Sequence, residues 1–153
     1  MTPGLGRTAL FALAAFSTVF CAAINAYTYR IAYPLWQWVG QQSFPALHRE
    51  YLRRLTPVIT VPHVVMFFSS GLLLWLRPPY LAPWQAGLLF ALDAGVVLVS
   101  AAAAGPIHTR FERERTLDPV AFARLLRISA LRTGMMLAAC VLLLQVLVSA
   151  LSH

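Results

Sequence analysis

The sequence contains no lysine and very little charge of either sign. Only 11% of its 153 residues are charged and 59% are hydrophobic, and the mean hydropathy is +0.70. A soluble domain usually carries about 25% charged residues, so this chain has too few polar groups to cover a surface that faces water. The composition therefore excludes a soluble enzyme and a disordered tail, and it indicates a membrane protein.

Cysteine is scarce, and several common cofactor motifs are missing. Cys21 and Cys140 are the two cysteines and both lie inside apolar runs, which predicts packed thiols rather than a disulfide staple. No glycine-rich phosphate-binding turn is present, so flavin and nicotinamide are disfavoured. No His-x-x-x-His or Glu-x-x-His pair occurs either, and metal binding has only a weak sequence signal.

Four apolar segments are long enough to cross a bilayer, which takes about 20 residues of helix. They cover about residues 8–29, 57–76, 84–107 and 129–151, with polar segments 30–56 and 108–128 between them. These lengths predict a single domain, 1–153, that is an all-α, antiparallel four-helix transmembrane bundle. Pro45, and Asp118 followed by Pro119, predict amphipathic helix extensions that run into the second and fourth spans.

All twelve basic residues are arginines, and their positions predict the topology. Ten of them fall in or beside the two long polar segments: Arg30, Arg49, Arg53, Arg54, Arg110, Arg113, Arg115, Arg124, Arg127 and Arg132. The positive-inside rule places these segments in the cytoplasm and both termini outside. The net charge of +7 therefore reflects membrane topology rather than a nucleic-acid partner, for which no recognition motif is present.

Polar residues inside the spans indicate which face of each helix is buried. Thr18, Cys21, Asn25 and Thr28 form one such stripe on the first span. Measured from the outer turn, His48 and His108 differ in height by only about 6 Å. We therefore expect His48, Tyr51, His108, Arg132 and Asn25 to gather at the cytoplasmic mouth, with Trp36 and the other span-end tryptophans at the headgroup level.

These polar residues allow several functional interpretations. His48 and His108 could be interfacial histidines, the ligands of a shared metal ion or haem, or general acid–base groups. His63 and Asp93 lie deeper and could form an ion pair or a proton relay, and with Asn25 they are the residues expected to contact a cofactor. Arg132 could either reach lipid phosphates or bind a substrate.

Several short strings resemble those of known proteins. Tyr33-Pro34-Leu35-Trp36, His48-x-x-Tyr51, Pro106-Ile107-His108 and Arg132-Thr133 resemble a group of small bacterial four-span integral membrane proteins of unassigned function. The layout also distantly resembles the anthrone-oxygenase-like membrane proteins. This resemblance implies a multi-pass protein of the bacterial inner (plasma) membrane and the oxidation of flat, hydrophobic aromatic substrates.

The leading hypothesis is a small membrane oxidoreductase, oxygenase-like, that acts on a lipophilic aromatic or quinone-like molecule entering from the bilayer. His48 or His108 would transfer a proton, Tyr51 would bond an oxygen, and Arg132 would stabilise an oxyanion. The alternative is a non-catalytic subunit of a larger membrane complex or a homo-oligomer, which a lipid-facing stripe of glycines would favour. A transporter is a third possibility, although no inverted repeat is visible.

The arginine count makes a direct prediction about topology. A reporter fused after His153 is expected to read as external in an intact-cell accessibility assay, because ten of twelve arginines favour the opposite side. A fusion placed at residues 39–43, between the first two spans, is the matched control and should read as cytoplasmic. The reverse pattern would contradict the prediction.

Overall fold

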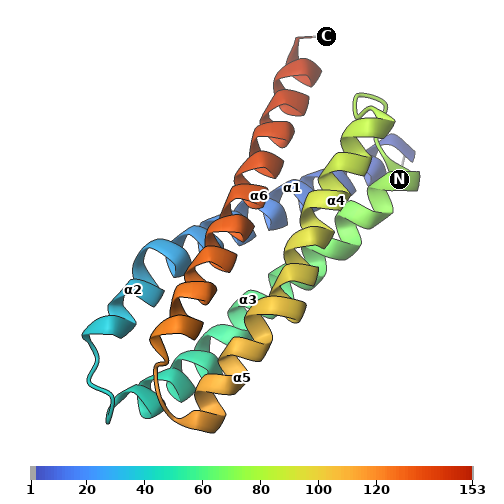
Figure 1. Cartoon of the computed structure of the whole chain (residues 1–153). Helices are drawn as coiled ribbons and strands as arrows, with labels where there is room; N and C mark the ends of the chain where they lie inside the picture. The colour runs from blue at the N-terminus through green and yellow to red at the C-terminus, as the bar shows by residue number, and fades with distance from the viewer. Residues whose placement is uncertain (1–2, 153) are drawn as a thin grey trace.

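The structure is a computed structural model that describes residues 3–152, and this part of the chain forms four long helical rods with no strand (Figure 1). In chain order, the helices are α1 (Pro3–Tyr27), η1 (Thr28–Ala32), α2 (Tyr33–Leu35), η2 (Trp36–Trp38), α3 (Phe44–Leu76), α4 (Pro83–Val99), η3 (Ser100–Ala104), α5 (Gly105–Glu114) and α6 (Pro119–Leu151). The first rod runs from α1 to η2 and the third from α4 to α5. The predicted all-α four-helix bundle is confirmed.

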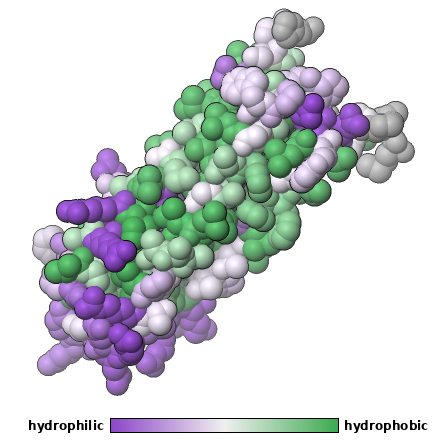
Figure 2. All heavy atoms as spheres, turned by 45° about the vertical axis from the view of Figure 1, so that its right-hand side comes forward, coloured by the Kyte–Doolittle hydropathy of each residue, from purple (hydrophilic) through white to green (hydrophobic). Residues whose placement is uncertain are grey.

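The four rods have the length and composition of membrane spans. Each contains a strongly apolar window, with mean hydropathy between 1.8 and 2.4. The surface seen in Figure 2 has an apolar band with hydrophilic residues gathered at its two ends, most densely at one of them. Because a bilayer needs such a band, the protein is a multi-pass membrane protein. We call the end with the loops 39–43 and 115–118 the arginine-rich end.

The helices extend farther than the predicted spans at the arginine-rich end. The extensions beginning at Phe44 and Pro119 are confirmed, and the side chain of Asp118 caps α6 by accepting a hydrogen bond from the Val120 amide at 2.9 Å. The third rod was expected to end at Ile107 but continues to Glu114, and the first continues past Tyr29 to Trp38. The polar segments are therefore mostly helical.

Two wide helical turns explain how the first and third rods continue through prolines. The π-helical turn η1 precedes Pro34, and the π-helical turn η3 precedes Pro106. A proline within a regular helix clashes with the carbonyl four residues earlier, and an extra residue in the preceding turn relieves this conflict. Each π turn also rotates the residues that follow it, which include Tyr33 and His108.

The core is arranged in three layers along the bundle. An apolar cluster that includes Phe11, Leu73, Leu89 and Leu143 fills the end near the termini, and a second cluster around Cys21 and Met66 lies in the middle. The third cluster, at the arginine-rich end, contains Tyr33, Trp36, Phe44, Ile107, Phe111 and Leu125. Trp36, which was expected at the headgroup level, belongs to this cluster and is only 2% exposed, because the continued helix turns its ring into the bundle.

The cap at Asp118 carries a prediction about stability. Asp118→Ala should lower the free energy of unfolding by about 1 kcal/mol, since the first turn of α6 loses its side-chain acceptor. Asp118→Asn keeps an acceptor oxygen and loses only the half-exposed pair with Arg110, so it should cost a few tenths of a kcal/mol. Thermal unfolding in detergent, followed by circular dichroism, measures both. Equal losses would mean that the ion pair matters rather than the cap.

Candidate functional site

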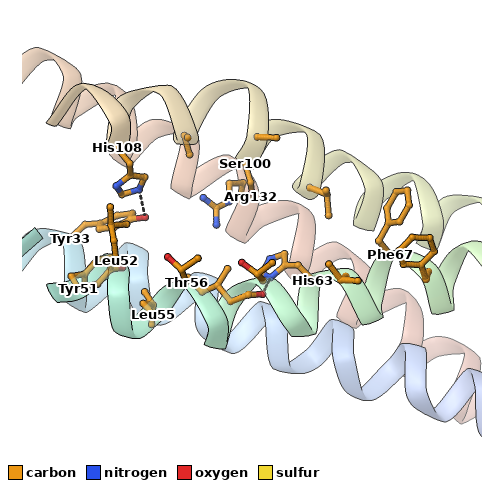
Figure 3. Close-up of a pocket in the computed structure, with 18 residues that line it drawn as sticks. Tyr33, Tyr51, Leu52, Leu55, Thr56, His63, Phe67, Ser100, His108 and Arg132 are labelled. Carbon is orange, nitrogen blue, oxygen red and sulfur yellow. Dashed lines mark hydrogen bonds between the residues drawn. The ribbon is translucent and has the colours of Figure 1, made fainter. Parts of the chain in front are cut away.

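An elongated pocket of about 420 Å³ opens on the side of the bundle between α3 and the third rod (Figure 3). Along α3 it extends from Tyr51 to Phe68, which is about 25 Å of helix. Its walls are mainly aliphatic and aromatic, and Phe67 and Phe68 line its deep end. Its polar lining includes Tyr33, Tyr51, His63, His108 and Arg132. The pocket is therefore a mainly apolar groove that is polar toward Tyr33, Tyr51 and His108.

The predicted meeting of His48 and His108 at one end of the bundle is confirmed. His48 Nε2 lies 3.1 Å from His108 Nδ1, and His108 Nε2 lies 3.2 Å from the hydroxyl of Tyr33 (Figure 3 shows the second contact). Each imidazole can accept a proton on one nitrogen and release one from the other. The three side chains therefore form a continuous hydrogen-bonded chain that ends in the pocket.

Aromatic rings hold this chain in place. The Trp36 ring contacts His48, His108 and Tyr51 at centroid distances of 5.3, 6.0 and 5.0 Å, close to perpendicular in each case. Phe44 stacks on His48 from the other direction at 5.4 Å. Edge-to-face and stacked rings are stabilised beyond their buried area, so the imidazoles have little freedom to rotate away.

A second polar network fixes Arg132. Its Nη2 donates to Asn25 Oδ1 at 2.6 Å, and the Asn25 amide donates to the Cys21 carbonyl at 2.9 Å and to His63 Nε2 at 3.3 Å. His63 Nδ1 lies 2.8 Å from the carbonyl oxygen of Ile59, so Nδ1 carries the hydrogen and Nε2 accepts. Asn25 on α1 therefore connects α6, through Arg132, with α3, through His63.

Two groups that line the pocket keep unused hydrogen-bonding capacity. The Nε of Arg132 and the hydroxyl of Tyr51 are buried and have no partner. Within residues 3–152, Arg132 also forms no ion pair with a carboxylate, although only 6% of it is exposed. The side chain therefore does not reach lipid phosphates. A buried guanidinium without a counter-charge favours binding of an anion or a developing oxyanion.

Asp93 lies outside the pocket. Its Oδ2 accepts a hydrogen bond from Thr18 at 3.2 Å, its Oδ1 has no partner, and the residue is fully buried. The expected ion pair with His63 is not formed in the described part of the chain, because His63 turns toward Asn25 and Ile59 instead. The structure thus gives Asp93 no contact with the pocket.

The donor set does not fit a resident metal ion or haem held by His48 and His108. Both nitrogens of His108 already have hydrogen-bond partners, His48 and Tyr33, so a metal ion bound to His108 would have to displace one of them. Among residues 3–152 no three His, Cys, Asp or Glu side chains lie close enough together to hold a metal ion. Cys21 and Cys140 are free thiols, as predicted.

The structure brings together most of the residues that the sequence singled out. Tyr51, His63, His108 and Arg132 line one pocket, with His48 and Asn25 directly behind it. Tyr33 and Trp36 had no assigned role, yet they complete the chain of hydrogen bonds and its aromatic support. The only signal for them was the string Tyr33-Pro34-Leu35-Trp36, which carried part of the family resemblance.

Comparison with known proteins yields no match: no family model, curated protein or solved structure is similar to the chain. The class of protein is therefore defined by the fold and the pocket, as a four-helix, multi-pass membrane protein with a mainly apolar lateral groove.

The Asn25 network leads to a prediction about stability. Asn25→Leu should lower the free energy of unfolding by about 2–3 kcal/mol, because it leaves the Arg132 guanidinium and the Nε2 atom of His63 without a partner inside the bundle. Ser17→Ala is the control, because that hydroxyl bonds only carbonyls of its own helix, and it should change stability by less than about 0.5 kcal/mol. Unfolding in mixed micelles measures both, and a mild effect of Asn25→Leu would argue against the network.

Proposed function

We propose that this protein is a small membrane oxidoreductase, oxygenase-like, that binds a lipophilic aromatic or quinone-like molecule in the lateral pocket. The observation that carries the proposal is the buried Arg132, which lines an apolar groove and has no carboxylate partner among the described residues. A ring oxygen that becomes negatively charged would supply the missing counter-charge. The bacterial inner membrane, with the arginine-rich end in the cytoplasm, is the location that the charge pattern supports.

Each polar residue of the pocket has a role in this proposal. His108, hydrogen-bonded to Tyr33, takes the proton from a ring hydroxyl, and Arg132 stabilises the oxyanion that is left. The unpartnered Tyr51 hydroxyl donates a hydrogen bond to a second oxygen of the ligand. The deprotonated ring is richer in electrons than the neutral one, and this makes it easier to oxidise. Dioxygen is the oxidant class that the oxygenase-like resemblance implies.

The length of the groove supports an amphiphile. A flat ring system at Arg132 leaves the aliphatic part of the groove, toward Phe67 and Phe68, for a tail or a second ring. Because the groove is open at the side of the bundle, a ligand dissolved in the bilayer can enter without passing through water.

The accessory-subunit alternative has less support. Gly71 packs against the ring of Phe90 and Gly95 lies beneath Met135, so these two glycines serve contacts inside the bundle. These two glycines are therefore not free for a partner helix, and Gly87, which has open space beside it, is a single position rather than a stripe with them.

The variant Tyr51→Phe should weaken ligand binding without lowering the stability of the fold. Tyr51→Phe removes a buried hydroxyl that has no partner, so the free energy of unfolding should stay the same or rise by up to about 1 kcal/mol. Its affinity for 4-nitro-1-naphthol, a flat lipophilic phenol with a coloured anion, should fall about five- to tenfold with the loss of one neutral hydrogen bond.

Binding is measured by absorbance titration in nanodiscs, with protein-free nanodiscs as the blank. Tyr27→Phe, at a half-exposed tyrosine that does not line the pocket, is the matched control and should bind as wild type does. Arg132→Gln should abolish the preference for the anionic form of the probe. A wild-type protein that does not bind the probe, or a Tyr51→Phe variant with full affinity, would contradict the proposed site.

A further inference from the structure

A second, much smaller cavity lies on the other side of His48. It has a volume of about 50 Å³ and is lined by Pro45, His48, Arg49, Phe111, Glu112 and Arg115, at the arginine-rich end. A single water molecule needs about 10–15 Å³ of such space, so the cavity has room for a few. Glu112, one of its lining residues, is also exposed on the surface of the protein.

His48 separates this small cavity from the large pocket. The residue is 1% exposed, lines the small cavity, and contacts His108, which lines the large one. The charged and titratable groups that face the pair are Glu112, Arg49 and Arg115 on the cavity side and Tyr33 and Arg132 on the pocket side. His48 and His108 are therefore the two side chains that connect the small cavity with the large pocket.

The interior at the opposite end of the bundle consists mainly of apolar side chains. The cluster that includes Phe11, Leu73, Leu89 and Leu143 fills it with apolar side chains. The hydroxyls next to this cluster, those of Ser17 and Ser69, donate to carbonyls of their own helices. The His108–His48 hydrogen bond therefore leads toward the arginine-rich end. Toward the termini, His63 contacts only the Cys21 thiol at 3.5 Å, and within residues 3–152 no hydrogen bond joins Cys21 to the Thr18–Asp93 pair beyond it.

We propose that His48 is a proton-transfer residue, which connects the pocket through His108 to the arginine-rich face and to that face alone. A proton from water in the small cavity binds His48 Nδ1, and the proton on His48 Nε2 moves to His108 Nδ1. The proton on His108 Nε2 then passes to a ligand oxyanion, directly or through the Tyr33 hydroxyl. The reverse sequence removes a proton from the ligand. This inference rests on the proposed function, since it needs an ionisable ligand in the pocket.

The test follows protonation of bound 4-nitro-1-naphthol after a rapid pH jump in nanodiscs, using the colour of its anion. In wild type, the bound probe should change colour faster than it dissociates, with dissociation measured separately by dilution. His48→Phe keeps a ring between Phe44 and Trp36 but cannot carry a proton, so the colour change should slow at least tenfold while the affinity stays within about twofold.

Chemical rescue distinguishes proton transfer from a structural role. His48→Ala joins the volume of the lost ring to the small cavity, so added imidazole should restore the fast colour change in this variant and have no effect in His48→Phe. Glu112→Gln should also slow the change. Glu114→Gln, on the same helix but outside the cavity and bonded to Arg110, should leave it as in wild type.

The outcomes separate the two proposals. If the probe does not bind wild type, the proposed function fails. If the probe binds but the colour change is equally fast in His48→Phe, or is no faster in wild type than dissociation, the pocket stands and the proton path is overturned. Slowing without rescue by imidazole would assign His48 a structural role and would also overturn the path.

Discussion

The hydrogen bond between Arg132 and Asn25 is the interaction on which the rest of the site depends. A guanidinium inside a membrane bundle is expensive, and here one short bond to an amide oxygen fixes its position. The same asparagine orients His63, and through the Cys21 carbonyl it is tied to its own helix. Because only part of the guanidinium is satisfied, Arg132 is rigidly placed and still able to bind a ligand.

Much of this arrangement could be predicted from the sequence. The stripe of Thr18, Asn25 and Thr28 is buried as its helical spacing indicated. The height comparison brought His48 and His108 to the same level, and their rings are in contact. These predictions hold because membrane helices are regular over most of their length, so residue number converts into depth and direction. The fold followed from hydropathy for the same reason.

The parts that could not be predicted lie where the helices are irregular. A helical wheel assumes a constant angle per residue, and the π turns η1 and η3 break that assumption just before Tyr33 and His108. The burial of the Trp36 ring could not be predicted for the same reason, since the first span was expected to end at about residue 29. The first and third spans were predicted to end at about residues 29 and 107, whereas the wide turns allow the helices to continue past Pro34 and Pro106. The irregular turns place both residues of the Tyr33–His108 contact.

The open groove and the buried charge constrain one another. An anion cannot cross the apolar part of the groove from the bilayer. The desolvation free energy of a bare charge there is far larger than the electrostatic stabilisation that Arg132 provides before the anion reaches it. In the proposed reaction the ligand therefore arrives neutral and loses its proton beside Arg132. That proton needs a route out of an apolar pocket, and the one hydrogen-bonded chain that leaves the pocket toward a polar surface in the described residues passes through His108 and His48. In the proposed reaction, the deprotonation of a lipid-soluble molecule, the lateral groove, the buried guanidinium without a carboxylate partner and the pair of contacting histidines each have a part.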